Sequence, residues 1–190
     1  MTEAEDVTQA GRDREGEPLV LYPADSQHAA EYLTHLKRIC EQTPFMLQSP
    51  QDALPLPGEQ GQVLHRLHSL NNSMCLLAFR PHRDPGLRAV GSLTLLGGRT
   101  HRTQHLCTLG MGVDRDDWGR GIGGALLDQA LAWARNNTIV KRIALKVFTE
   151  NEPALQLYRS RGFQTDGELL SEVVFNGSDY TLVGMNLCVD

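Results

Sequence analysis

A glycine-rich turn is the part of this sequence best suited to chemistry. It carries four glycines within six residues, after an apolar stretch and before a segment of helical periodicity: Gly119, Gly121, Gly123 and Gly124. Glycines allow positive φ and close approach of the backbone to a ligand. The free N–H groups and the dipole at a helix start attract phosphate, and Arg120 could add a direct contact. We therefore predict an anion-binding site on this turn.

The spacing Gly119-x-Gly121-x-x-Gly124 also satisfies the dinucleotide-binding fingerprint G-x-G-x-x-G. In a dinucleotide fold the first glycine ends the strand directly, whereas residues 114–118 intervene here, and too little chain follows for a second mononucleotide-binding half. The Lys-Ser or Lys-Thr of a P-loop is absent after the glycines. These departures disfavour both nucleotide-binding alternatives.

A second motif spans residues 151–163. Asn151 is a good N-cap with Pro153 in the first turn, and Gly162 ends the predicted helix. Tyr158 lies on the apolar face of that helix, where taken alone it fits a core aromatic residue better than an acid catalyst. Local helix chemistry explains most of this motif.

Hydrophobic periodicity places these motifs in an α/β fold. It predicts strands at 19–22, 74–79, 89–96, 104–113, 142–148, 168–175 and 180–187, and helices at 25–41, 59–70, 121–136 and 152–160. The strands before residue 113 read as an antiparallel series. Strand 104–113, the following helix and strand 142–148 predict a right-handed parallel crossover. Four prolines between residues 43 and 58 predict a long loop.

Length and charge limit the classes of protein. A chain of 190 residues with 41% hydrophobic residues suits one globular domain, which we assign to residues 18–190. Residues 1–17 hold six acids, two arginines and few apolar groups, so we predict a disordered acidic tail. The net charge of −5 disfavours a nucleic-acid partner.

No secretory signal or apolar run of membrane-spanning length is present, so we predict a cytoplasmic protein without a membrane partner. Four cysteines are widely separated, and no histidine lies at zinc-ligand spacing from any of them: Cys40, Cys75, Cys107 and Cys188. We therefore predict no metal, and expect each thiol to serve as a small apolar group.

Together, the two motifs resemble those of the GNAT superfamily of N-acetyltransferases. The family's Q/R-x-x-G-x-G/A motif aligns with residues 118–123, and N-x-x-A-x-x-L-Y-x-x-x-G-F with residues 151–163. Trp118 departs from the family pattern, because it stands where Gln or Arg is expected and offers a phosphate only its backbone N–H. The resemblance is specific over residues 106–163 and only topological before residue 89.

The resemblance implies a mixed, mainly antiparallel sheet of six to seven strands, with a central splayed parallel pair and helices on both faces. It implies acetyl-CoA as co-substrate and direct aminolysis of its thioester by an amine acceptor, either a small molecule or a protein amine. The cofactor-binding candidates are Met111, Gly112, Val113, Trp118, Gly119, Arg120, Gly121, Ile122, Gly123, Gly124 and Asn151.

Aminolysis needs a base for the amine and benefits from an acid for the thiolate. An alkyl ammonium of pKa near 10.4 is only about one part in 2,500 neutral at pH 7. Tyr158 matches the family's acid. The strand at 104–113 lacks the carboxylate that the family often uses as base, so His105, at its start, is a weak catalytic candidate. Glu150, Glu168 and Glu172 are weaker still.

Two other functions stay open at this point. The missing carboxylate would suit a non-catalytic acyl-CoA binding or sensing module, and the glycine fingerprint would suit a dinucleotide-binding oxidoreductase. The predicted acceptor site lies between the first helices with their proline-rich loop and the last hairpin, and nothing in the sequence identifies the acceptor. Related folds are often dimers, so a homodimer is also open.

Overall fold

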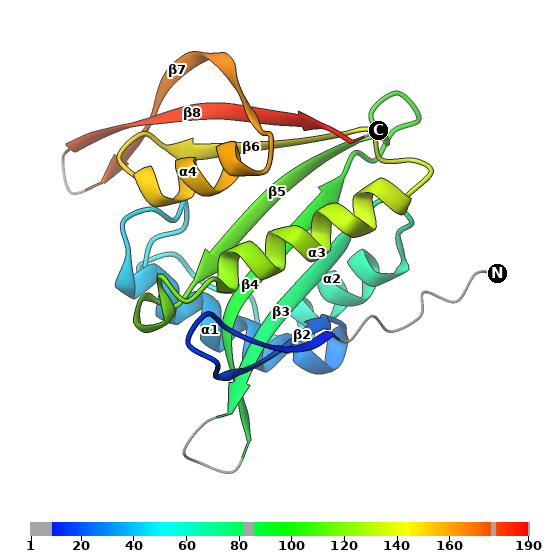
Figure 1. Cartoon of the computed structure of the whole chain (residues 1–190), viewed down its shortest axis with the longest axis vertical. Coiled ribbons are helices and arrows are strands. Elements are labelled where there is room, and N and C mark those ends of the chain that lie inside the picture. Colours follow the sequence, from blue (N-terminus) through cyan, green and yellow to red (C-terminus); the bar gives the residue numbers. More distant parts are fainter. Residues whose placement is uncertain (1–8, 82–85, 176–177, 190) are drawn as a thin grey trace.

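A single twisted sheet of eight strands organises the computed structural model, which describes residues 9–81, 86–175 and 178–189, without the side chains of residues 9, 167–172, 175 and 178. The strand order is β1-β2-β3-β4-β5-β6-β8-β7, and only β5 and β6 pair in parallel (Figure 1). The predicted mixed, mainly antiparallel sheet is thus confirmed, with one strand more than the six or seven expected.

The elements follow the predicted ones closely. The strands are β1 (Gln9–Arg12), β2 (Pro18–Pro23), β3 (Met74–Pro81), β4 (Leu87–Gly97), β5 (Leu106–Val113), β6 (Arg142–Phe148), β7 (Gln164–Phe175) and β8 (Ser178–Cys188). The α-helices are α1 (Ala29–Gln42), α2 (Pro57–Ser69), α3 (Ile122–Asn136) and α4 (Glu152–Ser160). Short 3-10 turns, η1 (Ser26–His28) and η2 (Arg115–Asp117), precede α1 and α3.

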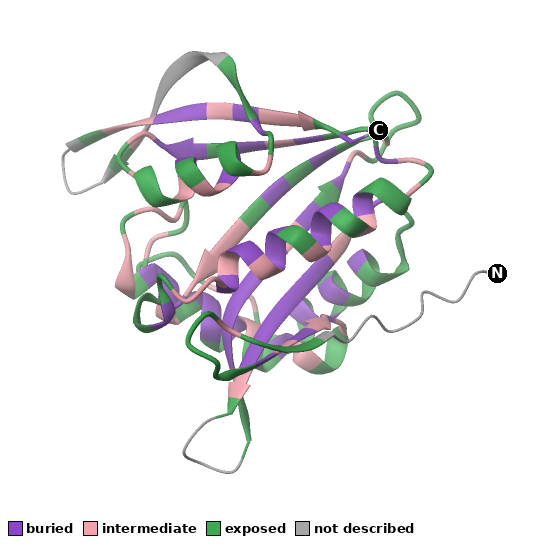
Figure 2. Cartoon of the chain, viewed as in Figure 1, coloured by how far each residue is buried: buried purple, intermediate pink, exposed green. Residues whose placement is uncertain are grey.

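Helices cover both faces of the sheet. In Figure 1, α3 lies in front of β3, β4 and β5, while α1 and α2 lie behind them. The main core lies under α3, where Leu126, Leu127 and Leu131 pack on strand residues such as Leu93 and Ile143. A second cluster around Leu64 and Leu77 fills the space under α2, and the buried bands along β3 and β4 are visible in Figure 2.

The N-terminal segment corrects one prediction. Residues 1–17 were expected to form a disordered tail, but Gln9–Arg12 pair antiparallel with β2, and the turn 13–17 is held by its own hydrogen bonds. Asp13 in that turn pairs with Arg80 at 2.7 Å, so a charge contact stabilises a segment with few apolar groups. The prediction is wrong for residues 9–17, and residues 1–8 lie outside the described residues.

The cysteines are all free. Burial raises the pKa of Cys75 to about 12 and that of Cys107 to about 11, which confirms that these two thiols are protonated and apolar in character. Cys188 is exposed, so the expectation of a buried apolar role is wrong for that residue.

The parallel pair is splayed, as predicted. Its register has only three residue pairs, which join residues 106–108 of β5 to residues 142–144 of β6. Beyond them β6 keeps its pairing with β8, while β5 keeps its pairing with β4. The carboxyl ends of the two strands therefore diverge in the middle of the sheet, with α3 beginning beside the end of β5 (Figure 1).

Candidate functional site

The free edge of β5 presents backbone groups to the splay. Asp114 N–H donates to Val90 O on β4 at 2.8 Å, and N–H directions alternate along a strand. Gly112 therefore faces β4, whereas Met111 and Val113 face the gap toward β6. Of the three predicted backbone ligands on this strand, the geometry brings Met111 and Val113 to the gap and turns Gly112 away.

The glycine turn carries donors without partners in the helix. Gly119 and Gly121 have φ of 78° and 86°, in the left-handed region that glycine tolerates best. Gly121 is the N-cap of α3, and its carbonyl accepts the first helical bond from Ala125 N–H at 2.9 Å. The N–H groups of Ile122, Gly123 and Gly124 precede that bond, so they are available to an anion.

Gly123 and Gly124 also let α4 approach α3. A Cβ added to Gly123 would lie 3.4 Å from Leu157, and one added to Gly124 would lie 3.2 Å from the Arg161 guanidinium. Arg161 in turn makes two hydrogen bonds to the Asp128 carboxylate, at 2.9 and 3.0 Å. These two glycines thus place α4, and with it Tyr158, beside the start of α3.

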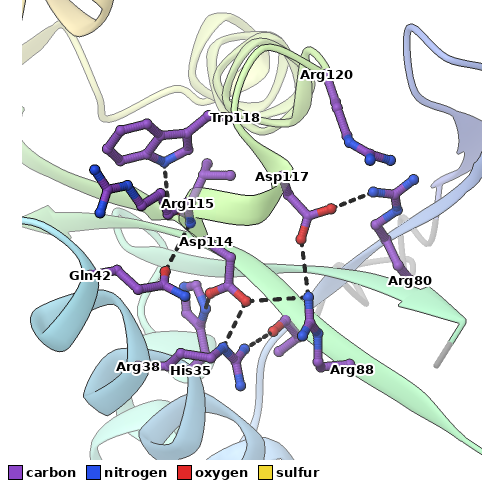
Figure 3. Close-up of polar contacts among 12 residues, drawn as sticks. His35, Arg38, Gln42, Arg80, Arg88, Asp114, Arg115, Asp117, Trp118 and Arg120 are labelled. Atoms are coloured by element: carbon purple, nitrogen blue, oxygen red, sulfur yellow. Dashed lines mark hydrogen bonds and ion pairs between the residues drawn. The ribbon is translucent and has the colours of Figure 1, made fainter. Parts of the chain in front are cut away.

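The backbone N–H of Trp118, which was predicted to be offered to a phosphate, instead donates to Arg115 O at 3.2 Å, and the side chain contacts β5. Its indole Nε1 donates to Val113 O at 2.8 Å, and the Arg115 guanidinium lies 6.0 Å from its ring centroid (Figure 3). The side chain is 48% exposed at the end of β5. The residue that replaces the family's Gln or Arg therefore ties the glycine turn to the strand edge and leaves a ring face open to a ligand.

A buried charge network holds the segment between β5 and α3, and the sequence did not suggest it. Asp114 accepts from Arg38 Nε at 2.7 Å and lies 3.6 Å from Arg88, which also contacts Asp117 at 3.2 Å (Figure 3). Arg80 bonds the other oxygen of Asp117. The two acids bound the turn η2, so arginines of α1, β3 and β4 fix the backbone that leads into the glycine turn.

The network contains a Ser–His–Asp arrangement in which the histidine lies between the other two side chains, as in a hydrolytic triad. His35 lies 3.0 Å from Asp114 through Nδ1 and 3.2 Å from Ser92 Oγ through Nε2. All three residues are buried, and the next position across the sheet, Gly112, packs against Ile39 of α1. No substrate can reach Ser92 there, so we assign the trio to the attachment of α1 to the sheet.

Tyr158 lies where α4 meets the core. It is 5% exposed, and its ring centroid is 5.6 Å from that of Phe163. Burial raises the pKa of its phenol well above the ordinary value of 10. Among the residues that the structure describes, no side chain pairs with its hydroxyl. A neutral phenol of this kind is a hydrogen-bond donor.

Two predicted site residues have other positions or tasks. His105 is exposed immediately before the amino end of β5, five residues before Gly110 and on the order of 16 Å from it along the strand, so it lies away from the carboxyl ends where β5 and β6 diverge. Asn151 uses its side-chain oxygen to cap α4, accepting from Ala154 N–H at 3.3 Å. The side chains of Glu168 and Glu172 lie outside the described residues.

A search of the described residues finds no group of three or more His, Cys, Asp and Glu side chains arranged to hold a metal ion. None of the described helices has the length and apolar character needed to cross a membrane.

Comparisons with known proteins point to one family. Residues 44–163 match the family model for the acetyltransferase (GNAT) family. The L-amino acid N-acetyltransferase AaaT of Escherichia coli K12 is 33% identical over 88 residues, which cover 46% of this chain and 54% of that protein. The N-alpha-acetyltransferase RimI of Mycobacterium tuberculosis is 42% identical over 73 residues, which cover 38% of this chain and 44% of that protein. The chain thus matches about half the length of these curated relatives.

Solved structures share the fold over nearly the whole chain. An acetyltransferase of the GNAT family from Streptococcus pneumoniae has a TM-score of 0.83 at 25% identity, covering 90% of this chain and 99% of its own. The structure of yncA from Salmonella typhimurium, solved with its cofactor acetyl-CoA, has a TM-score of 0.75 at 16% identity, covering 90% of this chain and 94% of its own.

Proposed function

This chain belongs to the GNAT acetyltransferase family, and on that premise we propose that it transfers the acetyl group of acetyl-CoA to an amine. The observation that carries the proposal is the pairing of an unfilled strand edge on β5 with a glycine turn at the start of α3. Acetyl-CoA has two parts that match these features, an amide-bearing arm and a diphosphate.

The chain's own groups fit this co-substrate. Met111 and the N–H of Val113, whose carbonyl accepts from Trp118 Nε1, would pair with the amides of its arm as an added strand does. The N–H groups of Ile122, Gly123 and Gly124 would bind the diphosphate at the positive end of α3. When bound, acetyl-CoA supplies the activated acetyl group. Backbone N–H groups at the splay would polarise the carbonyl of that group.

Tyr158 is our candidate acid. Its pKa, raised by burial, keeps the phenol protonated at the pH of any ordinary assay, so its O–H is present to hydrogen-bond the departing thiolate and to protonate it as negative charge develops on the sulfur. Because His105 lies before the amino end of β5, away from the divergent carboxyl ends of β5 and β6, we assign no described side chain as base and propose that the neutral fraction of the amine is the species that reacts.

The acceptor would enter beside the loop 43–56. Phe45 of that loop lies 5.8 Å from Phe148 at the end of β6, and Phe148 lies 6.0 Å from Tyr180 of β8, measured between ring centroids. These aromatic rings would form one wall of the amine side. By their names, the two curated relatives acetylate L-amino acids and an α-amine, so free L-amino acids and peptide N-termini are the first acceptors to test.

Two measurements test the proposal. Acetyl-CoA titrated into the protein should change the fluorescence of Trp118, and Trp118→Phe should lose most of that signal while Trp133 remains. A panel of amines with acetyl-CoA should then release free thiol for at least one amine class. Binding without release for every amine would favour the acyl-CoA sensing alternative, and protection from unfolding by NAD but not acetyl-CoA would favour the oxidoreductase.

The backbone of the glycine turn gives a specific test of where the diphosphate binds. Gly119 has positive φ and open space where a Cβ would stand, so Gly119→Ala changes only backbone strain. We expect the Kd of acetyl-CoA to rise by up to about tenfold, because a non-glycine residue pays about 1–2 kcal/mol in this conformation, and a free turn that relaxes to relieve this strain must regain the conformation on binding.

Two companion variants serve as controls. Gly119→Asn should lose less affinity, since Asn tolerates the left-handed region. Gly58→Ala, also in open space but within α2, should bind as the wild type does. Calorimetric Kd values that agree between Gly119→Ala and the wild type would place the diphosphate elsewhere.

The cytoplasmic location and the homodimer stay predictions.

A further inference from the structure

The turn between β1 and β2, residues 13–17, lies against the glycine turn that begins α3. Arg14 N–H donates to Arg120 O at 3.0 Å. The side chain of Arg14 covers Gly121: a Cβ added there would lie 3.0 Å from its Cγ and 3.1 Å from its Nε. A cationic side chain from the first strand pair is therefore placed at the N-cap of α3.

Arg120, the cation that the sequence offered to a phosphate, is engaged elsewhere. Its guanidinium lies 3.1 Å from Glu15 and 3.9 Å from Asp13. Asp13 is also paired with Arg80 at 2.7 Å. In Figure 3 the Arg120 side chain points toward Arg80 and away from Trp118. Glu15 and Asp13 thus hold the Arg120 guanidinium toward Arg80 and the buried charge network.

Arg14 has no such engagement. No acid among the residues that the structure describes forms an ion pair with it, and the residue is exposed. The acids closest along the chain, Asp13 and Glu15, are neutralised by Arg80 and Arg120. The charge left free beside Gly121 is therefore positive. An unpaired guanidinium next to unpartnered helix N–H groups suits a phosphate, which it binds with charge-assisted hydrogen bonds.

We propose that Arg14 binds a phosphate group of coenzyme A, so that the turn 13–17 completes the cofactor site from outside the two sequence motifs. The inference rests on the proposed function. It assigns Arg14, rather than Arg120, as the cation at this position, and assigns Asp13 and Glu15 the task of holding Arg120 away from the ligand. The bound group is the diphosphate or the 3′-phosphate, which share the same chemistry.

Arg14→Ala in the full chain tests the proposal by calorimetry. We expect the Kd of acetyl-CoA to rise about tenfold, with Arg14→Lys intermediate, because one charge-assisted contact is lost or weakened. Arg102→Ala is the matched control: it removes the same charge from an exposed site before the amino end of β5, and its Kd should stay within about twofold of wild type. The Tm of each unliganded variant checks that folding is unchanged.

Dephospho-CoA separates the two phosphate sources. If the ratio of Kd between Arg14→Ala and wild type falls to about one with dephospho-CoA, Arg14 binds the 3′-phosphate; if the ratio persists, it binds the diphosphate. Equal Kd values for Arg14→Ala and wild type with acetyl-CoA overturn the inference alone. A wild-type protein that binds neither ligand overturns the proposed function itself.

Discussion

Replacing Tyr158 by Phe is expected to lower kcat for acetyl transfer by about 100-fold or more, while the Kd of acetyl-CoA stays within about twofold of wild type. The substitution removes only the phenolic hydroxyl, and a positioned general acid contributes roughly 10²–10⁴ to a rate. The ring keeps its place against Phe163, so the site retains its shape. Steady-state kinetics and calorimetry on the same preparation measure the two quantities.

Tyr22→Phe is the matched control for Tyr158→Phe. Tyr22 packs edge-on against Phe79 in the cluster under α2, away from α4, so its hydroxyl should not affect transfer. A Tyr158→Phe enzyme with wild-type kcat would remove Tyr158 from the mechanism. An equal loss in both variants would point to a general loss of folding instead.

The dependence of kcat/KM on pH should show whether a protein base takes part in the reaction. If the neutral amine is the reacting species, kcat/KM should rise about tenfold per pH unit up to the pKa of the acceptor, which is near 10.4 for an alkyl amine and about 7.7–8.0 for a peptide N-terminus. Tyr158 loses its proton only above its raised pKa, so no fall in rate due to that group should occur below pH 10. With an alkyl amine as acceptor, a plateau beginning near pH 7 would instead indicate a protein base.

Local sequence patterns predicted the elements that hold the site. The bounds of β6 and α4 agree with the predicted ones, because each depends on its own periodicity and, for α4, on the Asn151 cap and Gly162. The two motifs also placed the glycine turn and Tyr158 correctly in the chain. What a motif could not give is the direction in which each backbone group of β5 faces, which separates Gly112 from Met111 and Val113.

Contacts between distant segments were not predictable in the same way. Arg14 and Arg80 lie far from Arg120 in the chain, and nothing in their local sequence indicates that one turn brings them together. Composition made residues 1–17 look disordered because it counts apolar groups and not ion pairs. The same limitation hid the network around Asp114, whose partners come from α1 and β4.

Asp114→Asn should lower the free energy of unfolding by about 3–5 kcal/mol. The Asp114 side chain is 1% exposed, and its carboxylate faces Arg38, Arg88 and His35. Removing the charge takes the carboxylate partner away from the partly buried Arg38 guanidinium and leaves Arg88 with Asp117 alone, which is the costly way to break such a network. Urea unfolding followed by circular dichroism measures the change.

Asp128→Asn provides the comparison that separates burial from charge. Asp128 also pairs with an arginine through two hydrogen bonds, but its side chain is 58% exposed, so its loss should cost under about 1 kcal/mol. A similar small loss for Asp114→Asn would mean that the network does not stabilise the fold.

The Asp114→Asn variant should also bind acetyl-CoA more weakly, measured at a temperature where it remains folded, because Asp114 bounds η2. Asp128→Asn should affect binding less. If the network around Asp114 holds the glycine turn in place, Asp114→Asn should both lower stability and raise the Kd of acetyl-CoA. If the network stabilises only the fold, the variant should lose stability while its Kd stays unchanged.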